Sequence, residues 1–131
     1  MRKSCIGIIV GIILLIGIDT TDAKWTPIAN NPQGDTYYFE DTSIKREGDL
    51  ISGEFNQSYV KPKLSNGIYI SSTSIRIAYN PKTNRFWGKF LCNYGMDNKA
   101  IRDNKIHNWV EMPSEYYPVV IDSIRYILLN N

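Results

Sequence analysis

The chain carries few residues of the types that do covalent or metal chemistry. It has one histidine, His107, and two cysteines, of which Cys92 lies in a stretch rich in β-formers. Cys92 alternates onto the apolar side of that stretch, where a thiol is inert unless an electropositive setting lowers its pKa. A small buried hydrophobe is therefore the favoured interpretation of Cys92. An intermolecular disulfide and a Cys92–His107 nucleophile pair are the alternatives.

Other catalytic signatures are equally weak. Residues 24–131 hold one His and one Cys, which would need carboxylates to hold zinc, and no ligand spacing of that kind occurs in the sequence. The serine-rich run 71–74 lacks a nucleophile-elbow frame, and a strand surface explains it better. Acidic residues are scattered through turns, so none are nominated as an acid–base pair. The sequence predicts a protein that is not an enzyme and uses no cofactor or metal, with a small hydrolase as the alternative.

The first 23 residues have the layout of a secretory signal peptide. A positive start, Met1-Arg2-Lys3, precedes an apolar run at 6–18, and Thr21-Asp22-Ala23 offers a small-residue cleavage site. The apolar run is shorter than the ~20 residues of a membrane span. An uncleaved anchor is the alternative. Cleavage would leave residues 24–131 as one exported domain, in the periplasm or on the outer cell surface, with no further membrane insertion.

The charge balance points to no broad class of anionic partner. The formal net charge is +2, so overall charge gives no reason to expect nucleic acid or an anionic membrane as partner. Basic residues near exposed tyrosines do suit a protein- or glycan-binding surface. The candidate ligand contacts are Lys61, Lys63, Lys99, Arg102 and Lys105. The alternative is that these are ordinary solubilising charges.

The centre of the predicted fold is a β-hairpin at residues 68–94. Two β-rich runs flank the turn-forming cluster at 80–84. The second run alternates so that Phe86, Gly88, Phe90, Cys92 and Tyr94 share one face. In the first run, Ile68 and Ile70 are out of phase with Ile75, which predicts a β-bulge near Ser71-Ser72.

The remaining segments predict a sheet closed by a helix. Strands are expected at 24–29, 36–39 and 50–60, with an edge position for the first because it contains Pro27. A short strand or turn follows at 44–49, a polar loop at 95–108 and a short apolar run at 109–112. After Pro113-Ser114-Glu115, apolar residues recur at helical spacing: Tyr117, Val120, Ile121, Ile124, Ile127 and Leu128. The fold class is therefore α+β: an antiparallel sheet of about six strands with one C-terminal α-helix packed on it.

The order of these motifs resembles the surface-adhesin protein E family of Gram-negative bacteria. The resemblance covers residues 24–128 and is carried by the following motifs: Trp25-x-Pro27-Ile28, a Gly34 loop, Tyr37-Tyr38, Asp41-x-Ser43-Ile44-x-Arg46-x-Gly48, Tyr59 near a proline, and Tyr69-x-Ser71-Ser72. It implies an adhesin-E-like binding domain whose partners are host extracellular-matrix or serum proteins, or heparin-like glycans. A periplasmic inhibitor or accessory protein that binds another protein is the alternative.

One family feature is missing. Members of the family tether the helix to the sheet with a disulfide, whose nearest positions here are Tyr79 and Leu128. Loss of such a bridge forgoes about 2–4 kcal/mol. We expect an apolar contact between these positions to replace it. The matrix-binding residues of the family match no motif in this chain, so none are transferred.

Overall fold

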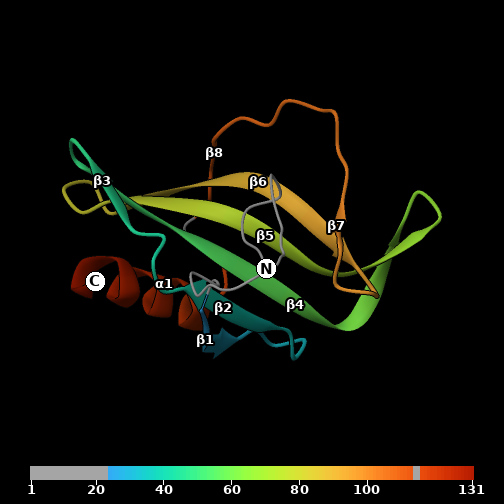
Figure 1. Ribbon diagram of the computed structural model, residues 1–131. Helices are drawn as coiled ribbons and strands as arrows, with labels where there is room; N and C mark the ends of the chain where they lie inside the picture. Colours follow the sequence, from blue (N-terminus) through green and yellow to red (C-terminus); the bar gives the residue numbers. More distant parts are fainter. Residues whose placement is uncertain (1–23, 114–115) are drawn as a thin grey trace, which may run out of the picture.

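The computed structural model describes residues 24–113 and 116–131. In these residues, eight strands form one antiparallel sheet and a C-terminal helix packs on it (Figure 1). The predicted fold class is confirmed. About six strands were expected and eight are present. The predicted loop at 95–108 contains the two-residue strand Ala100–Ile101, and the predicted apolar run at 109–112 contains the two-residue strand Val110–Glu111. The predicted signal segment 1–23 and the residues Ser114 and Glu115 lie outside the described residues.

The sheet has the order β1-β2-β4-β5-β6-β7, with β3 also pairing with β4 and β8 also pairing with β6. Strand β1, which contains Pro27, is at the edge, as predicted. The bounds of the elements are β1 Trp25–Asn30, β2 Thr36–Glu40, β3 Lys45–Glu47, β4 Leu50–Ser65, β5 Ile68–Asn80, β6 Arg85–Gly95, β7 Ala100–Ile101, β8 Val110–Glu111 and α1 Pro118–Asn130.

The central hairpin forms as predicted, with one unforeseen irregularity. The register of β5 against β6 shifts between Ile70 and Ser72, which confirms the predicted bulge. A second shift pairs Cys92 with Ser74 but Phe90 with Ile75. Leu91 is therefore an extra residue, and it turns Cys92 to the face opposite Phe90. The prediction that Cys92 shares the face of Phe90 was wrong, because strict alternation does not survive a bulge.

Strand β4 is longer than predicted and creates a projecting hairpin. It continues past Pro62 to Ser65, and its register against β5 shifts between Ser58 and Lys63. Pro62 falls within this irregular stretch, where its missing N–H interrupts no regular ladder. Asn66 and Gly67 both have positive φ, at 51° and 79°, which is the geometry of a two-residue Asn-Gly hairpin turn. We call residues 59–70 the arm; it extends to the right in Figure 1.

Helix α1 covers one face of the sheet beside β1 and β4 (Figure 1). It buries Val120, Ile121, Ile124 and Leu128, which belong to the predicted apolar stripe. A Cβ added to Gly53 would lie 3.3 Å from Leu128 Cδ2 and 3.1 Å from Phe39 Cε1, so a larger residue here would require these side chains to shift slightly. Tyr79 and Leu128 both belong to the buried core cluster. The core consists of Tyr37, Phe39, Phe55, Ile77, Tyr79, Phe86, Val120, Ile121, Ile124 and Leu128.

Candidate functional site

The predicted ligand contacts divide between the arm and the loops that follow β6. Lys63 pairs with Ile70, and Ile70 pairs with Gly95, whose N–H donates to the carbonyl of Lys99. Lys63 and Lys99 therefore lie at the same end of the sheet, separated by one strand. Arg102 directly follows β7 at this end, and Lys105 lies farther along the β7–β8 loop. All five predicted side chains are exposed: Lys61, Lys63, Lys99, Arg102 and Lys105.

None of these five side chains forms an ion pair with a residue in the described ranges. Lys63 instead places its ammonium 4.5 Å from the centroid of the Tyr59 ring. The Tyr59 hydroxyl lies 2.7 Å from Thr73 Oγ1, which in turn donates to Asn93 Oδ1 at 2.7 Å. This chain of contacts crosses from β4 through β5 to β6 and orients Tyr59 at the base of the arm.

Asp35 fixes the base of the arm from the other side. Its carboxylate is buried and accepts hydrogen bonds from the Val60 N–H at 2.9 Å, Gln57 Nε2 at 3.0 Å and Asn31 Nδ2 at 3.1 Å. Burial by itself raises the pKa of Asp35, but these hydrogen bonds, led by that from Val60, outweigh it, so the pKa lies below its ordinary value. A charged Asp35 therefore ties the β1–β2 turn to the point where β4 leaves the sheet.

The apex of the arm carries exposed apolar side chains that sequence reasoning missed. Leu64 is 61% exposed, Tyr69 56% and Ile68 49%, and Met96 in the neighbouring β6–β7 turn is 62% exposed. Periodicity assigned Ile68 to the central sheet because it could not show that the hairpin runs beyond the other strands. One feature of the sequence does set this region apart: no Asp or Glu occurs between Glu54 and Asp97, so all formal charges in this stretch are positive.

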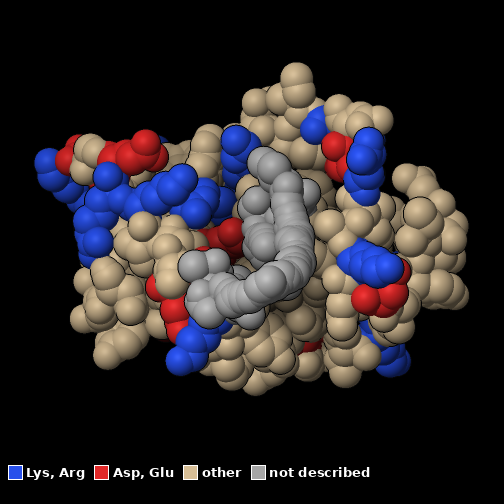
Figure 2. Space-filling model, in the orientation of Figure 1, with Lys and Arg blue, Asp and Glu red and all other residues tan. Residues whose placement is uncertain are grey.

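A second group of basic residues lies at the opposite end of the sheet. Figure 2 shows a continuous area of Lys and Arg over β3 and the adjoining strand ends, whereas those over the arm and β7 stand apart from one another. The register places Lys89 beside Arg76, which lies beside Glu54. Burial lowers the pKa of Arg76, and the nearby glutamates, Glu54 first, oppose that effect. Acidic residues therefore accompany the cations at this end.

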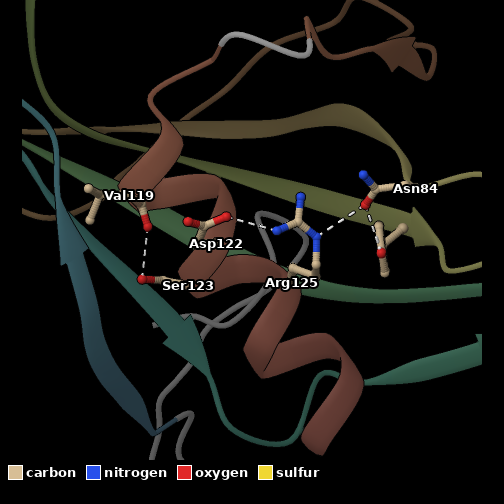
Figure 3. A network of polar contacts seen from close by, with 6 residues as sticks. Asn84, Val119, Asp122, Ser123 and Arg125 are labelled. Atoms are coloured by element: carbon tan, nitrogen blue, oxygen red, sulfur yellow. Dashed lines mark hydrogen bonds and ion pairs between the residues drawn. The ribbon is translucent and has the colours of Figure 1, made fainter.

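An open groove of about 460 Å³ lies between the start of β6 and helix α1. Arg125 crosses it: Nε donates to Asn84 Oδ1 at 3.1 Å and Nη1 to Asp122 Oδ1 at 2.8 Å (Figure 3). The guanidinium also lies 5.4 Å from the centroid of the Phe86 ring. Arg85 on the rim faces Glu111 at 3.6 Å. Both cations of the groove have acidic partners, so we assign it the structural role of fastening α1 to the β5–β6 turn.

The structure does not bring Cys92 and His107 together as a nucleophile pair. Cys92 is 1% exposed and is not a free thiol. His107 Nε2 lies 2.9 Å from Asp103 Oδ2, and its ring centroid lies 4.5 Å from that of Phe90, on the other side of the sheet from Cys92. The Lys105 N–H, followed by His107, lowers the pKa of Asp103. These contacts shape the β7–β8 loop.

The described ranges hold no group of three His, Cys, Asp or Glu side chains suited to a metal ion. Nor do they include a helix long and apolar enough to cross a membrane. No protein-family model, curated protein or solved structure matches the chain.

Proposed function

We propose that the chain is an exported, non-enzymatic binding domain, similar to surface-adhesin protein E. Its ligands are host extracellular-matrix or serum proteins, or heparin-like glycans. One observation supports this proposal most directly. The basic side chains of the arm and of the β6–β8 loops are exposed, and none forms an ion pair in the described ranges, although Lys63 acts on Asp35 and Lys105 on Asp103 through their charges.

The physical reason is the availability of charge. A cation beside a carboxylate has its field largely cancelled, and an incoming anion must compete with that carboxylate. Lys63 and Lys99 form no ion pair in the described ranges, Asp35 acts on Lys63 only through its charge, and the register brings the two lysines to the same end of the sheet. A sulfated glycan can span separate cations along its length, so a continuous basic area is not required.

The test is heparin-affinity chromatography of the full chain over a salt gradient. A variant with glutamine at the five predicted positions should elute at clearly lower salt, and the salt dependence should weaken by roughly one released counterion per lost contact. The substitutions are Lys61→Gln, Lys63→Gln, Lys99→Gln, Arg102→Gln and Lys105→Gln. Retention that does not depend on salt, or no retention of the parent protein, would refute the glycan version of the proposal.

A matched control removes cations from the opposite end of the sheet. The triple variant Lys45→Gln, Lys82→Gln, Lys89→Gln should lose less retention per removed charge than the five-residue variant. Equal losses per removed charge in the two variants would mean that heparin responds to net charge alone, and the arm would then have no special role.

A second candidate function is an accessory or inhibitory role inside the periplasm. It is favoured by the outer edge of β4, where pairing with β2 ends at Ser58 and no described strand continues beside the arm. A partner strand could add to this edge. Protease treatment of intact cells separates the two candidates. Loss of the domain supports a surface adhesin, and survival until the outer membrane is broken supports a periplasmic partner, which crosslinking would then identify.

A further inference from the structure

We propose that the apex of the arm docks peripherally on an anionic lipid surface. The apex consists of the Asn66-Gly67 turn and the residues that flank it. Three of these are large apolar side chains in solvent, with Leu64 61% exposed, Tyr69 56% and Ile68 49%. A soluble protein does not ordinarily gather such side chains at the end of a projecting hairpin unless they have a partner.

The distribution of these side chains favours lipid over a protein partner. Leu64 lies directly opposite Tyr69, so both point to one face of the arm, whereas Ile68 lies opposite Ser65 and points to the other face. A protein lying flat against the arm would cover only one of these faces. Acyl chains surround an apex that enters them, so both faces would be covered at once.

The charges near the apex match an anionic headgroup layer. No Asp or Glu occurs between Glu54 and Asp97, so the arm carries only the positive charges of Lys61 and Lys63. Lys63 pairs with Ile70, two residues back from the turn-flanking pair. At about 3.3 Å per residue this is roughly 7 Å behind the apex. That separation suits apolar groups at the acyl boundary and lysines among phosphates, since interfacial elements bury to about 5–10 Å.

The neighbouring β6–β7 turn adds to the same surface. Met96, 62% exposed, follows Gly95, which pairs with Ile70 of the arm. Asp97 is the nearest acidic residue in sequence, and its carboxylate accepts the N–H of Lys99 at 3.0 Å. Tyr69 offers a ring with a polar end, the type of side chain that favours a membrane–water interface. Local charge and exposure thus point to a partner that the overall net charge of +2 did not suggest.

The arm is also already ordered for docking. Its turn has both residues in the left-handed conformation, and its base is held by the Asp35–Val60 hydrogen bond at 2.9 Å and the Tyr59–Thr73 contact at 2.7 Å. A preorganised element loses little conformational entropy when it binds.

This inference goes beyond the proposed function and can fail separately. Heparin requires the lysines but has no use for Leu64 or Ile68. The double variant Leu64→Ser, Ile68→Ser should therefore keep its elution position on heparin while losing the response to lipid. If heparin retention fails but the lipid response holds, only the proposed glycan binding is wrong.

The test is hydrogen exchange of the arm amides in the full chain, titrated with vesicles of equimolar phosphatidylcholine and phosphatidylglycerol. This readout is local to residues 60–70, so lipid contact elsewhere in the chain does not affect it. Exchange should slow with these vesicles, and more lipid should be needed as salt rises. In the double variant, the lipid concentration that produces half of the slowing should rise about a hundredfold. Each of the two lost apolar side chains accounts for a factor of roughly ten. The control Val119→Ser, Leu129→Ser removes exposed apolar groups from α1 and should respond like the parent.

Three outcomes would overturn the proposal. If the hydrogen-exchange rates of the arm amides did not change when vesicles were added, lipid docking would be excluded. An equal response in the parent and the double variant would show that the apex does not mediate it. If the exchange of the arm amides slowed without vesicles, and more so at higher protein concentration, the partner of the apex would instead be a second copy of this chain.

Discussion

The two ends of the sheet use basic residues in opposite ways. We call the end of the sheet that holds β3 and the β5–β6 turn, where Arg125 of α1 attaches, the helix end. There, Lys82 pairs with Asp49 at 3.2 Å, Arg85 with Glu111 at 3.6 Å and Arg125 with Asp122 at 2.8 Å. At the arm end, Lys61, Lys63 and Lys99 form no ion pair in the described ranges, and exposed apolar side chains lie near them.

This difference separates structure from binding. Lys82, Arg85 and Arg125 at the helix end lie in ion pairs, and Arg125 in addition joins α1 to the β5–β6 turn. Cations at the arm end leave their charge available to an external anion. Basic density alone would select the end opposite the arm, because the larger basic area in Figure 2 lies over β3. Lys45 and Lys89 at the helix end also form no ion pair in the described ranges, so the arm end is distinguished by the combination of unpaired cations with exposed apolar side chains.

The largest effect is expected from a charge in the core that closes the helix end. Ile124 is 0% exposed, and Ile124→Asp would bury a carboxylate without a partner. The cost should exceed about 4 kcal/mol, enough to unfold a domain of this size. Circular dichroism should show no cooperative melting. Val119→Asp, at a position 67% exposed on the same helix, is the control and should melt like the parent. A folded Ile124→Asp protein with an unshifted melting curve would refute the helix docking.

A smaller loss is expected from Asp35→Asn at the base of the arm. The charged carboxylate accepts three hydrogen bonds, and weakening them should cost about 2 kcal/mol at neutral pH. Because the folded pKa of Asp35 is lowered, its stabilisation is fully present above the unfolded pKa of about 3.9. It is lost as pH falls through the folded value. Urea unfolding across this range should show a shallower acid loss in the variant than in the parent.

The control for this prediction is Asp49→Asn, since Asp49 forms only an exposed ion pair with Lys82. Its unfolding free energy should stay close to that of the parent over the same pH range. If the curves for Asp35→Asn and the parent ran parallel from neutral to acid pH, the carboxylate would not be held in its charged form by the contacts described.

The sequence allowed the helix end to be predicted well. Apolar residues at helical spacing identified Val120, Ile121, Ile124 and Leu128, all of which are buried. The turn formers at 80–84 predicted the hairpin between β5 and β6, and a phase change between Ile70 and Ile75 predicted its bulge. These features are local or periodic, so a pattern along the chain is sufficient to reveal them.

The arm end could be predicted only in part. The basic residues were recognised, but whether they have acidic partners depends on strand register, which pattern alone does not fix. Pro62 suggested that β4 stops before it, whereas the strand passes through an irregular stretch and reaches Ser65. The second bulge, at Leu91, was not visible in the sequence pattern either, and it reversed the face assigned to Cys92. Both errors concern registry between strands.

A loss of about 1 kcal/mol is expected when Arg125 is replaced at the helix end. Arg125→Lys keeps the charge but cannot bridge Asn84 and Asp122 with one planar group while lying over Phe86. Urea unfolding should detect the loss. Arg102→Lys at the arm end, where no ion pair is present, should leave stability unchanged. Equal effects of the two substitutions would contradict the structural role given to the helix-end cations.

The smallest change in stability is expected from the paired substitutions Lys82→Gln and Lys63→Gln. The Lys82–Asp49 pair is exposed, with side-chain exposures of 75% and 58%, so its loss should cost less than about 0.5 kcal/mol. Lys63 contributes an exposed contact with the Tyr59 ring, of comparable size, and its charge also acts on Asp35. The two variants should therefore have nearly the same unfolding free energy but different elution from heparin, where only Lys63→Gln should move to lower salt. If Lys82→Gln moved as far, pairing with Asp49 would not withhold the charge from an external ligand. The distinction between the two ends would then reduce to the exposed apolar side chains of the arm.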